Sequence, residues 1–227
     1  MKKLFFFAAL AVSAMLNAQT YDFTTLDIQD ADLTVADGTK SFNDAKGYYE
    51  IKNTAGATVS LTIAQVPNVT FTYKNSSEKK AFVVKPLNYV QMDGDQRDLT
   101  ISGLTVGTTI TLSVASKGTT GNSFEDSESK GTGLTGCVWV SGNKTQAPKS
   151  GEMVFEEVTV QAIASTITIR TTAGGYALNK IVIGNGGTGV ENVAAQAQKA
   201  VKVIENGQLY IIKNGVKYNA LGAKVAE

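Results

Sequence analysis

The segment 93–98 carries three acidic side chains that could act together on a metal ion. Asp93, Asp95 and Asp98 are closely spaced, and carboxylates around a turn are typical ligands of Ca²⁺, which takes roughly 6–8 oxygen atoms. Arg97 offsets part of their charge, so a solvated turn is the alternative interpretation. A second acidic group admits the same two interpretations: Asp27, Asp30 and Asp32. The metal hypothesis names Asp93, Asp95 and Asp98 as calcium ligands.

Four aromatic side chains are candidates for binding a sugar: Trp139, Tyr48, Tyr49 and Tyr89. Sugar rings have apolar faces that stack on aromatic rings, and their hydroxyls bond to neighbouring polar groups. Trp139 lies between Val138 and Val140, and alternation along a strand turns it away from both. If the two valines point inward, Trp139 points outward and is the best single ligand candidate. The alternative is a tryptophan in the core.

The composition limits the chemistry that the chain can perform. It has no histidine, which removes the commonest general base, the commonest zinc ligand and every Ser-His or Cys-His dyad. Its single cysteine, Cys137, cannot form an internal disulfide and is expected to be a small buried hydrophobe. Lys and Arg total 21 against 20 Asp and Glu, so no basic excess points to nucleic acid. These features favour a binding or structural module over an enzyme.

One enzymatic hypothesis remains open. A polysaccharide lyase can use Tyr, Lys or Arg as its base, with Ca²⁺ neutralising the carboxylate of a uronate substrate. The candidates for these roles are Lys85, Tyr89, Arg97 and Arg170. Nothing in their spacing brings the four together.

Strand patterns dominate the region that must position these residues. Apolar residues alternate with Thr, Ser and Lys, which buries one face of each strand and suits antiparallel sheets. The alternating sets are Val59, Leu61 and Ile63; Val69, Phe71 and Tyr73; Ile110, Leu112 and Val114; Val158 and Val160; Ile167 and Ile169; Ile181 and Ile183. Further strands are expected near 21–28, 47–52, 81–85, 137–140 and 152–160. The sequence predicts an all-β protein with an antiparallel β-sandwich or jelly roll over residues 19–184.

The segments after the main strands have their own character. Residues 117–136 are rich in Gly, Ser, Thr and acids, and so long a loop is either functional or mobile. Residues 185–199 form a Gly-rich linker or a short helix. In 200–227, Asn206-Gly207 and Asn214-Gly215 separate alternating apolar runs, which is a strong hairpin signal. This tail is predicted to be a small β-meander.

The N-terminus has the features of a secretory signal peptide over residues 1–18. Lys2 and Lys3 precede an apolar run over 4–16, and small residues follow. Cleavage is expected after Ala18 or after Ala14. The run is shorter than the roughly 20 apolar residues of a membrane-spanning helix, although an uncleaved anchor is the alternative. The chain is therefore expected to be exported, with no transmembrane span after cleavage.

The tail resembles a C-terminal sorting domain of the type IX secretion pathway, in a short form. The resemblance rests on Leu209-Tyr210-Ile211, on segment 218–222 and on Val225. It implies recognition of residues 200–227 by secretion machinery and a location at the cell surface, on the outer membrane or outside the cell.

The body is similar in pattern to galactose-binding-like jelly rolls that accompany secreted glycan-degrading proteins. The similarity rests on Tyr21-Asp22-Phe23 and on the segments 82–86, 99–115 and 178–183. It implies a polysaccharide or other glycan as partner. The leading expectation is an exported, non-catalytic carbohydrate-binding protein. The alternatives are a structural or adhesive surface protein without a small ligand, and the calcium-assisted lyase.

Overall fold

The computed structural model describes residues 18–117, 121–148 and 152–184, and three strands nearer the C-terminus. All but the last residue of the predicted signal peptide, and the predicted linker 185–199, lie outside the described residues. Contacts divide the chain into two compact units, residues 1–186 and 187–227. No helix in the described part of the chain is long and apolar enough to cross a membrane.

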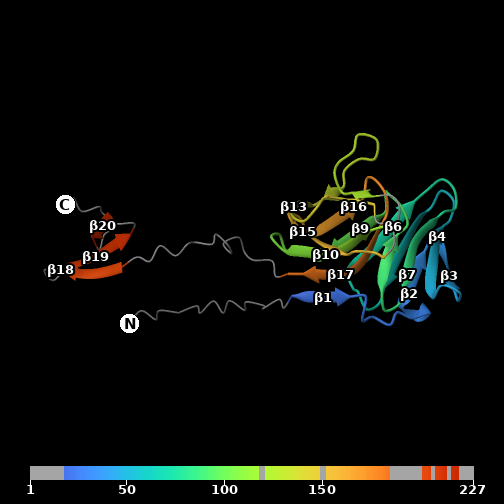
Figure 1. The fold of residues 1–227 in the computed structure, drawn as a ribbon, viewed down its shortest axis with the longest axis horizontal. Coiled ribbons are helices and arrows are strands. Elements are labelled where there is room, and N and C mark those ends of the chain that lie inside the picture. The colour runs from blue at the N-terminus through green and yellow to red at the C-terminus, as the bar shows by residue number, and fades with distance from the viewer. Residues whose placement is uncertain are drawn as a thin grey trace, which may run out of the picture. The chain divides into compact units, whose positions relative to one another are not determined.

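The larger sheet of the first unit has nine antiparallel strands among the described residues. Eight follow the order β13-β15-β10-β17-β8-β7-β4-β3, and β1 pairs with β17 beside β8. The bounds are β1 Gln19–Asp22, β3 Gly38–Asn43, β4 Tyr48–Asn53, β7 Lys80–Lys85, β8 Tyr89–Met92, β10 Thr109–Ser116, β13 Cys137–Ser141, β15 Glu156–Ala162 and β17 Tyr176–Ile183. Figure 1 shows β10, β17 and β1 of this sheet side by side.

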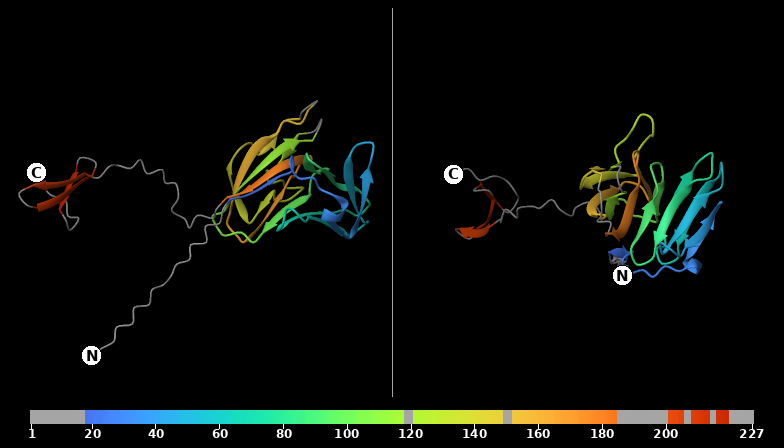
Figure 2. Two further views of the ribbon diagram at one scale, coloured as in Figure 1. Left: turned by 90° about the horizontal axis from the view of Figure 1, so that it is seen from below. Right: turned by 45° about the vertical axis from the view of Figure 1, so that its right-hand side comes forward.

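The smaller sheet has six antiparallel strands among the described residues, in the order β12-β16-β9-β6-β5-β2. Their bounds are β2 Leu33–Ala36, β5 Thr58–Ile63, β6 Val69–Lys74, β9 Asp98–Ser102, β12 Leu134–Thr135 and β16 Thr166–Arg170. A short pair, β11 (Asn122–Ser123) and β14 (Thr145–Gln146), and a 3-10 turn, η1 (Asp30–Asp32), complete the unit. Figure 2 shows the unit from two further sides.

The two sheets share one hydrophobic core, so the prediction of an antiparallel β-sandwich is confirmed. Phe71 of β6 and Phe82 of β7 meet across it with their ring centroids 6.1 Å apart. The alternating sets predicted from the sequence point inward in both sheets, apart from Ile183, which is partly buried against the core. Burying one large apolar side chain contributes roughly 1.5–3 kcal/mol, so this alternation is the main source of stability.

The outer face of the six-stranded sheet carries a row of threonines, one on each strand: Thr34, Thr62, Thr70, Thr100, Thr168 and Thr135. Each is the direct partner of the next across the sheet, and the hydroxyls of Thr100 and Thr168 lie 3.2 Å apart. Threonine is favoured on the wet face of a strand because its branched side chain fits the pleated surface. We call this set the threonine row.

The described part of the long segment 117–136 is folded onto the sandwich. Phe124 is 1% exposed and packs between Trp139 and Tyr176, with ring centroids at 5.8 and 5.3 Å. Its backbone N–H donates to the Lys144 carbonyl, and the Thr172 hydroxyl donates to the Glu125 carbonyl. Phe124 is therefore part of the core, and its backbone is tied down on both sides.

The second unit contains three antiparallel strands that pair in sequence order, β18 (Val201–Glu205), β19 (Gln208–Lys213) and β20 (Val216–Asn219). This is the small C-terminal β-meander predicted from the sequence. The two Asn-Gly pairs lie outside the described residues.

Candidate functional site

The segment 93–98 crosses from one sheet to the other, and this separates its carboxylates. Asp93 follows β8 of the nine-stranded sheet, whereas Asp98 begins β9 of the six-stranded sheet. Asp93 pairs with Lys80 at 3.4 Å and also with Lys117. No three His, Cys, Asp or Glu side chains among the described residues are placed to hold a metal ion.

The prediction that Asp93, Asp95 and Asp98 share a calcium ion is therefore wrong. Asp95 pairs with Lys130 at 3.1 Å, and Asp98 pairs with Arg170. Each carboxylate is neutralised by different cations, so their oxygens do not converge.

The second acidic group is also engaged in local contacts. Asp27 accepts from the Gln29 amide at 2.8 Å, and Asp30 pairs with Lys40 at 3.0 Å. Asp32 accepts from the Gln29 backbone N–H at 2.8 Å, which lowers the pKa of its carboxyl. These contacts organise the turn η1.

Arg97, a candidate for lyase chemistry, is 6% exposed and holds the backbone together. Its Nε donates to the Ala81 carbonyl, and its two Nη atoms donate to the Lys80 and Asp95 carbonyls, all at 2.8 Å. The pairing of β4 with β7 shifts register at Ala81, which is typical of a bulge. Arg97 satisfies the carbonyls at this irregularity, and burial lowers the pKa of its guanidinium.

Trp139 packs inward, because the condition for an outward Trp139, that Val138 and Val140 point inward, is not met. It lies partly buried against the core, and its indole N–H donates to the Gly142 carbonyl at 3.1 Å. Val138 and Val140 are exposed, at 44% and 54%, as is Ser141 at the end of β13. The alternation holds, but β13 is an edge strand whose outer face is wet, so the valines occupy that face. Cys137 is buried, as predicted.

Two of the predicted tyrosines lie on the outer face of the nine-stranded sheet, and the third does not. Tyr49 is buried and packs on Phe42, with ring centroids 4.7 Å apart. Tyr48 and Tyr89 are partly exposed. Lys85 is the direct partner of Tyr89, and the register between β4 and β7 places Tyr48 on the other side of Lys85. We call Tyr48, Lys85 and Tyr89 the tyrosine row.

Ammonium groups lie beside both rings of the tyrosine row. Lys46 Nζ is 5.8 Å from the centroid of Tyr48, and Lys85 Nζ is 5.9 Å from that of Tyr89. Neither lysine forms an ion pair with another described residue. Burial, and then the nearby Tyr48 phenol, raise the pKa of Tyr89. Tyr89 therefore stays a neutral phenol at physiological pH, with an apolar ring and a hydrogen-bonding hydroxyl.

A charged cluster borders the tyrosine row on the same outer face. Lys80 lies between Glu50 and Asp93, at 3.8 and 3.4 Å. Burial is the largest single influence on Lys80 and opposes its charge, but the Asp93 and Glu50 carboxylates together with Tyr48 outweigh it and raise the pKa of the ammonium. The Gln91 amide also donates to Asp93, at 2.9 Å. The polar groups of this cluster pair with one another, whereas the rings of Tyr48 and Tyr89 stay partly exposed.

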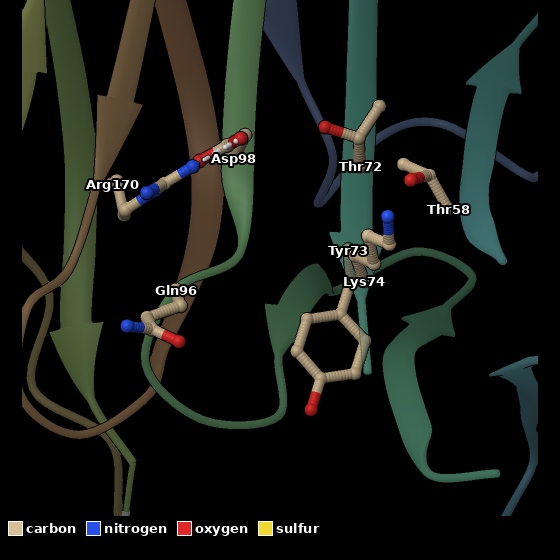
Figure 3. A pocket seen from close by; sticks show the side chains of 7 residues that line it. All are labelled: Thr58, Thr72, Tyr73, Lys74, Gln96, Asp98 and Arg170. Atoms are coloured by element: carbon tan, nitrogen blue, oxygen red, sulfur yellow. Dashed lines mark hydrogen bonds and ion pairs between the residues drawn. The ribbon is translucent and has the colours of Figure 1, made fainter. Parts of the chain in front are cut away.

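A pocket of about 330 Å³ opens on the outer face of the six-stranded sheet (Figure 3). Cross-strand register places Thr72, Asp98 and Arg170 in one row on three adjacent strands. Thr58 and Lys74 are direct partners one step further along. The lining residues are Thr58, Thr72, Tyr73, Lys74, Gln96, Asp98 and Arg170.

Asp98 and Arg170 form the fixed centre of the pocket. Arg170 donates through Nε and Nη2 to the two Asp98 oxygens at 2.5 and 2.7 Å, and Figure 3 shows the two groups pointing toward each other. These bonds raise the pKa of the guanidinium, and bidentate pairs of this kind are among the strongest side-chain contacts. Tyr73 packs on Arg97, whose guanidinium carbon is 3.9 Å from the ring centroid.

The pocket combines residues that were singled out in the sequence with residues that were not. Asp98 and Arg170 were candidates for different chemistries, and the structure brings them together. Thr58, Thr72, Lys74 and Gln96 were missed. The available signal was polar alternation, since the threonines alternate with core residues in 58–63 and 69–74.

The fold and these two surfaces define an antiparallel β-sandwich with one aromatic and one polar outer site. No protein-family model matches the chain, and no match was found among curated proteins or among solved structures. The function is therefore argued from the residues themselves.

Proposed function

We propose that this protein is an exported, non-catalytic carbohydrate-binding β-sandwich that binds a glycan at the cell surface or outside the cell. The observation that carries the proposal is the tyrosine row, two partly exposed phenol rings on one outer face. Aromatic rings beside polar groups are what a sugar-binding face requires and what a purely structural module does not need. The tyrosine row lies on adjacent strands, so its rings are held by the rigid part of the fold.

The dimensions of the sheet suit a chain of sugars rather than an isolated ring. Tyr48 and Tyr89 lie on β4 and β8, with β7 between them. Neighbouring strands are about 4.8 Å apart, so the two backbones are about 10 Å apart. A glycan that crosses the strands can therefore place two of its sugars on two rings. The flanking ammonium groups of Lys46 and Lys85 can donate to sugar hydroxyls or carboxylates.

Binding is favoured over lyase chemistry by the surroundings of the candidate bases. Tyr89 and Lys85 are neighbours, but the raised pKa of Tyr89 keeps its proton in place, and a base must lose its proton first. Arg97 is buried and bonded to backbone carbonyls. Arg170 lies in the other sheet and is bonded to Asp98. The four candidates therefore do not form one site.

Export is proposed on the charged and apolar pattern of residues 1–18, and handling by secretion machinery is proposed on residues 200–227. Fractionation of cells that produce the full chain would test both proposals. The expected result is a processed form at the surface or in the medium. A chain that lacks residues 200–227 should still lose its signal peptide, but it should not cross the outer membrane.

The decisive experiment measures glycan binding by Tyr48→Ala and Tyr89→Ala. The mature protein is first screened on a glycan array, and the affinity for the best ligand is then measured by calorimetry. Each alanine variant should weaken binding about ten-fold or more, equal to about 1.4 kcal/mol, because a stacking surface is lost. Tyr48→Phe and Tyr89→Phe keep the ring and should retain most of the affinity.

The matched control is Val140→Ala, on the exposed face of the same sheet at its opposite edge. This variant should bind like the unmodified protein. Binding that both tyrosine variants retain would refute the tyrosine row as the site. If no glycan binds at all, the alternative of a structural or adhesive surface protein becomes the better account.

A further inference from the structure

We infer that the pocket on the six-stranded sheet is a second binding site, which takes an acidic sugar through its carboxylate. The inference extends the proposed carbohydrate binding to another surface, and it rests on that function only for the class of ligand. The pocket is separate from the tyrosine row, because the two sites lie on the outer faces of different sheets.

The unused hydrogen-bonding groups of the pocket are mainly donors. Asp98 occupies Nε and Nη2 of Arg170, which leaves Nη1 without a hydrogen-bond partner among the described residues. The Lys74 ammonium and the hydroxyls of Thr58 and Thr72 likewise have no hydrogen-bond partner among the described residues. An ammonium has only donors to offer, and a threonine hydroxyl can donate or accept. A ligand that satisfies this set must supply several oxygen acceptors.

The charge of the pocket selects an anion with a single charge. Arg170 and Asp98 neutralise each other, so Lys74 leaves one net positive charge at the pocket. A sugar carboxylate matches it and also brings ring hydroxyls for the threonines and for the Gln96 amide. A neutral sugar leaves the ammonium without a counter-charge. The volume of about 330 Å³ is at the lower end of the range for ligand sites, roughly 300–1,000 Å³, which suits one sugar residue.

The position of the pocket suits the end or side of a polymer rather than an isolated ion. It lies one step along the strands from the threonine row, since Thr70 and Thr72 are alternate residues of β6. A chain that leaves the pocket therefore meets a line of further hydroxyls on neighbouring strands. The donors of the pocket sit on β5, β6 and β16 of one hydrogen-bonded sheet, so their backbones need little ordering on binding.

The test is a titration of the isotope-labelled mature protein followed by amide NMR. The probes are D-glucuronate, D-glucose as the neutral analogue, and acetate as the carboxylate without a sugar. Glucuronate should shift amides at 72–74, 96–98 and 170, and at equal concentration glucose and acetate should shift them far less. Lys74→Gln and Thr72→Val should each weaken the glucuronate response at least five-fold. Lys79→Gln, another exposed lysine near the sheet ends, should leave it unchanged.

Three results would overturn the inference. Unchanged glucuronate binding in both Lys74→Gln and Thr72→Val would remove the pocket as the site. Equal responses to glucose and glucuronate would remove the acidic class, and an equal response to acetate would reduce the site to a simple anion site. The double variant Tyr48→Ala/Tyr89→Ala separates the two proposals, since the pocket should respond normally in it even if the tyrosine row binds no glycan.

Discussion

At the scale of single residues, Arg97 is expected to contribute strongly to stability. Its guanidinium bonds to three carbonyls, two of them at the bulge of β7. Arg97→Met keeps much of the apolar stem but removes the donors to the Lys80 and Asp95 carbonyls, whereas the Ala81 carbonyl keeps the Asp93 backbone N–H. We expect the free energy of unfolding to fall by about 2–4 kcal/mol. Urea unfolding measures this difference.

Arg97→Lys is the informative companion variant. It retains the positive charge, but a single ammonium cannot reach carbonyls on both sides as the planar guanidinium does. It should therefore rescue little of the lost stability. If the free energy of unfolding of Arg97→Lys lay within about 0.5 kcal/mol of that of the unmodified protein, the guanidinium's several N–H donors would not be needed.

Cys137 should make stability depend on pH in the alkaline range. Burial raises the pKa of its thiol from 9.0 to about 11. Between these values the unfolded chain releases the proton and the folded protein keeps it, so the stabilisation is present below pH 9 and is lost as pH rises toward 11. The stability advantage over Cys137→Ala should shrink from about pH 8 to about pH 10.5. Urea unfolding of both proteins at the two pH values measures this difference in stability. A difference that does not change with pH would contradict the prediction.

The same strand shows how far single residues can be predicted from a sequence. Residues two apart share a face, so Cys137 and Trp139 must lie on the same side of β13. The burial of Cys137 was predicted correctly, and it already implies an inward Trp139. An assignment of the inner face from the two valines gives the opposite result. Alternation determines which residues lie together, whereas the choice of the inner face depends on whether the strand lies at an edge.

At the scale of elements, the described part of 117–136 should behave as core rather than as a loose loop. Phe124→Ala removes a ring that packs on two other aromatic rings, and changes of this type cost roughly 3–5 kcal/mol. It should also speed amide hydrogen exchange in β11 and β14. Thermal unfolding with hydrogen exchange measures both effects. Val106→Ala, at a site 60% exposed, is the control and should change little.

Most strands were predictable because each is encoded by its own alternation. The site was less predictable, because it depends on which strands become neighbours. Thr72, Asp98 and Arg170 belong to three strands that the sequence does not show to be adjacent. The carboxylates of 93–98 were close in sequence but belong to two sheets. Residues close in sequence therefore suggested a metal site that the fold does not form. The pocket residues are far apart in sequence, so their proximity was not apparent.

At the scale of the whole molecule, the two compact units should be independent in stability. The boundary at Gly186 divides the contacts of the chain into two sets. A protein that ends at Gly186 should keep the unfolding temperature of the sandwich within about 2 °C, because the described core residues all lie between Tyr21 and Ile183. Calorimetry of the full and shortened chains tests this. A drop of many degrees would show that the second unit stabilises the first.

The sandwich turns the outer faces of its two sheets away from each other. The tyrosine row and the pocket on the six-stranded sheet therefore point in opposite directions, and one short ligand cannot contact both. If each face binds a polysaccharide chain, a single protein molecule crosslinks two polysaccharide chains. Such crosslinking raises the viscosity of a polysaccharide solution without any chemical reaction. Excess protein reverses the effect, because each polysaccharide chain is then covered by its own protein molecules. The fold then acts through the mechanics of the surrounding gel.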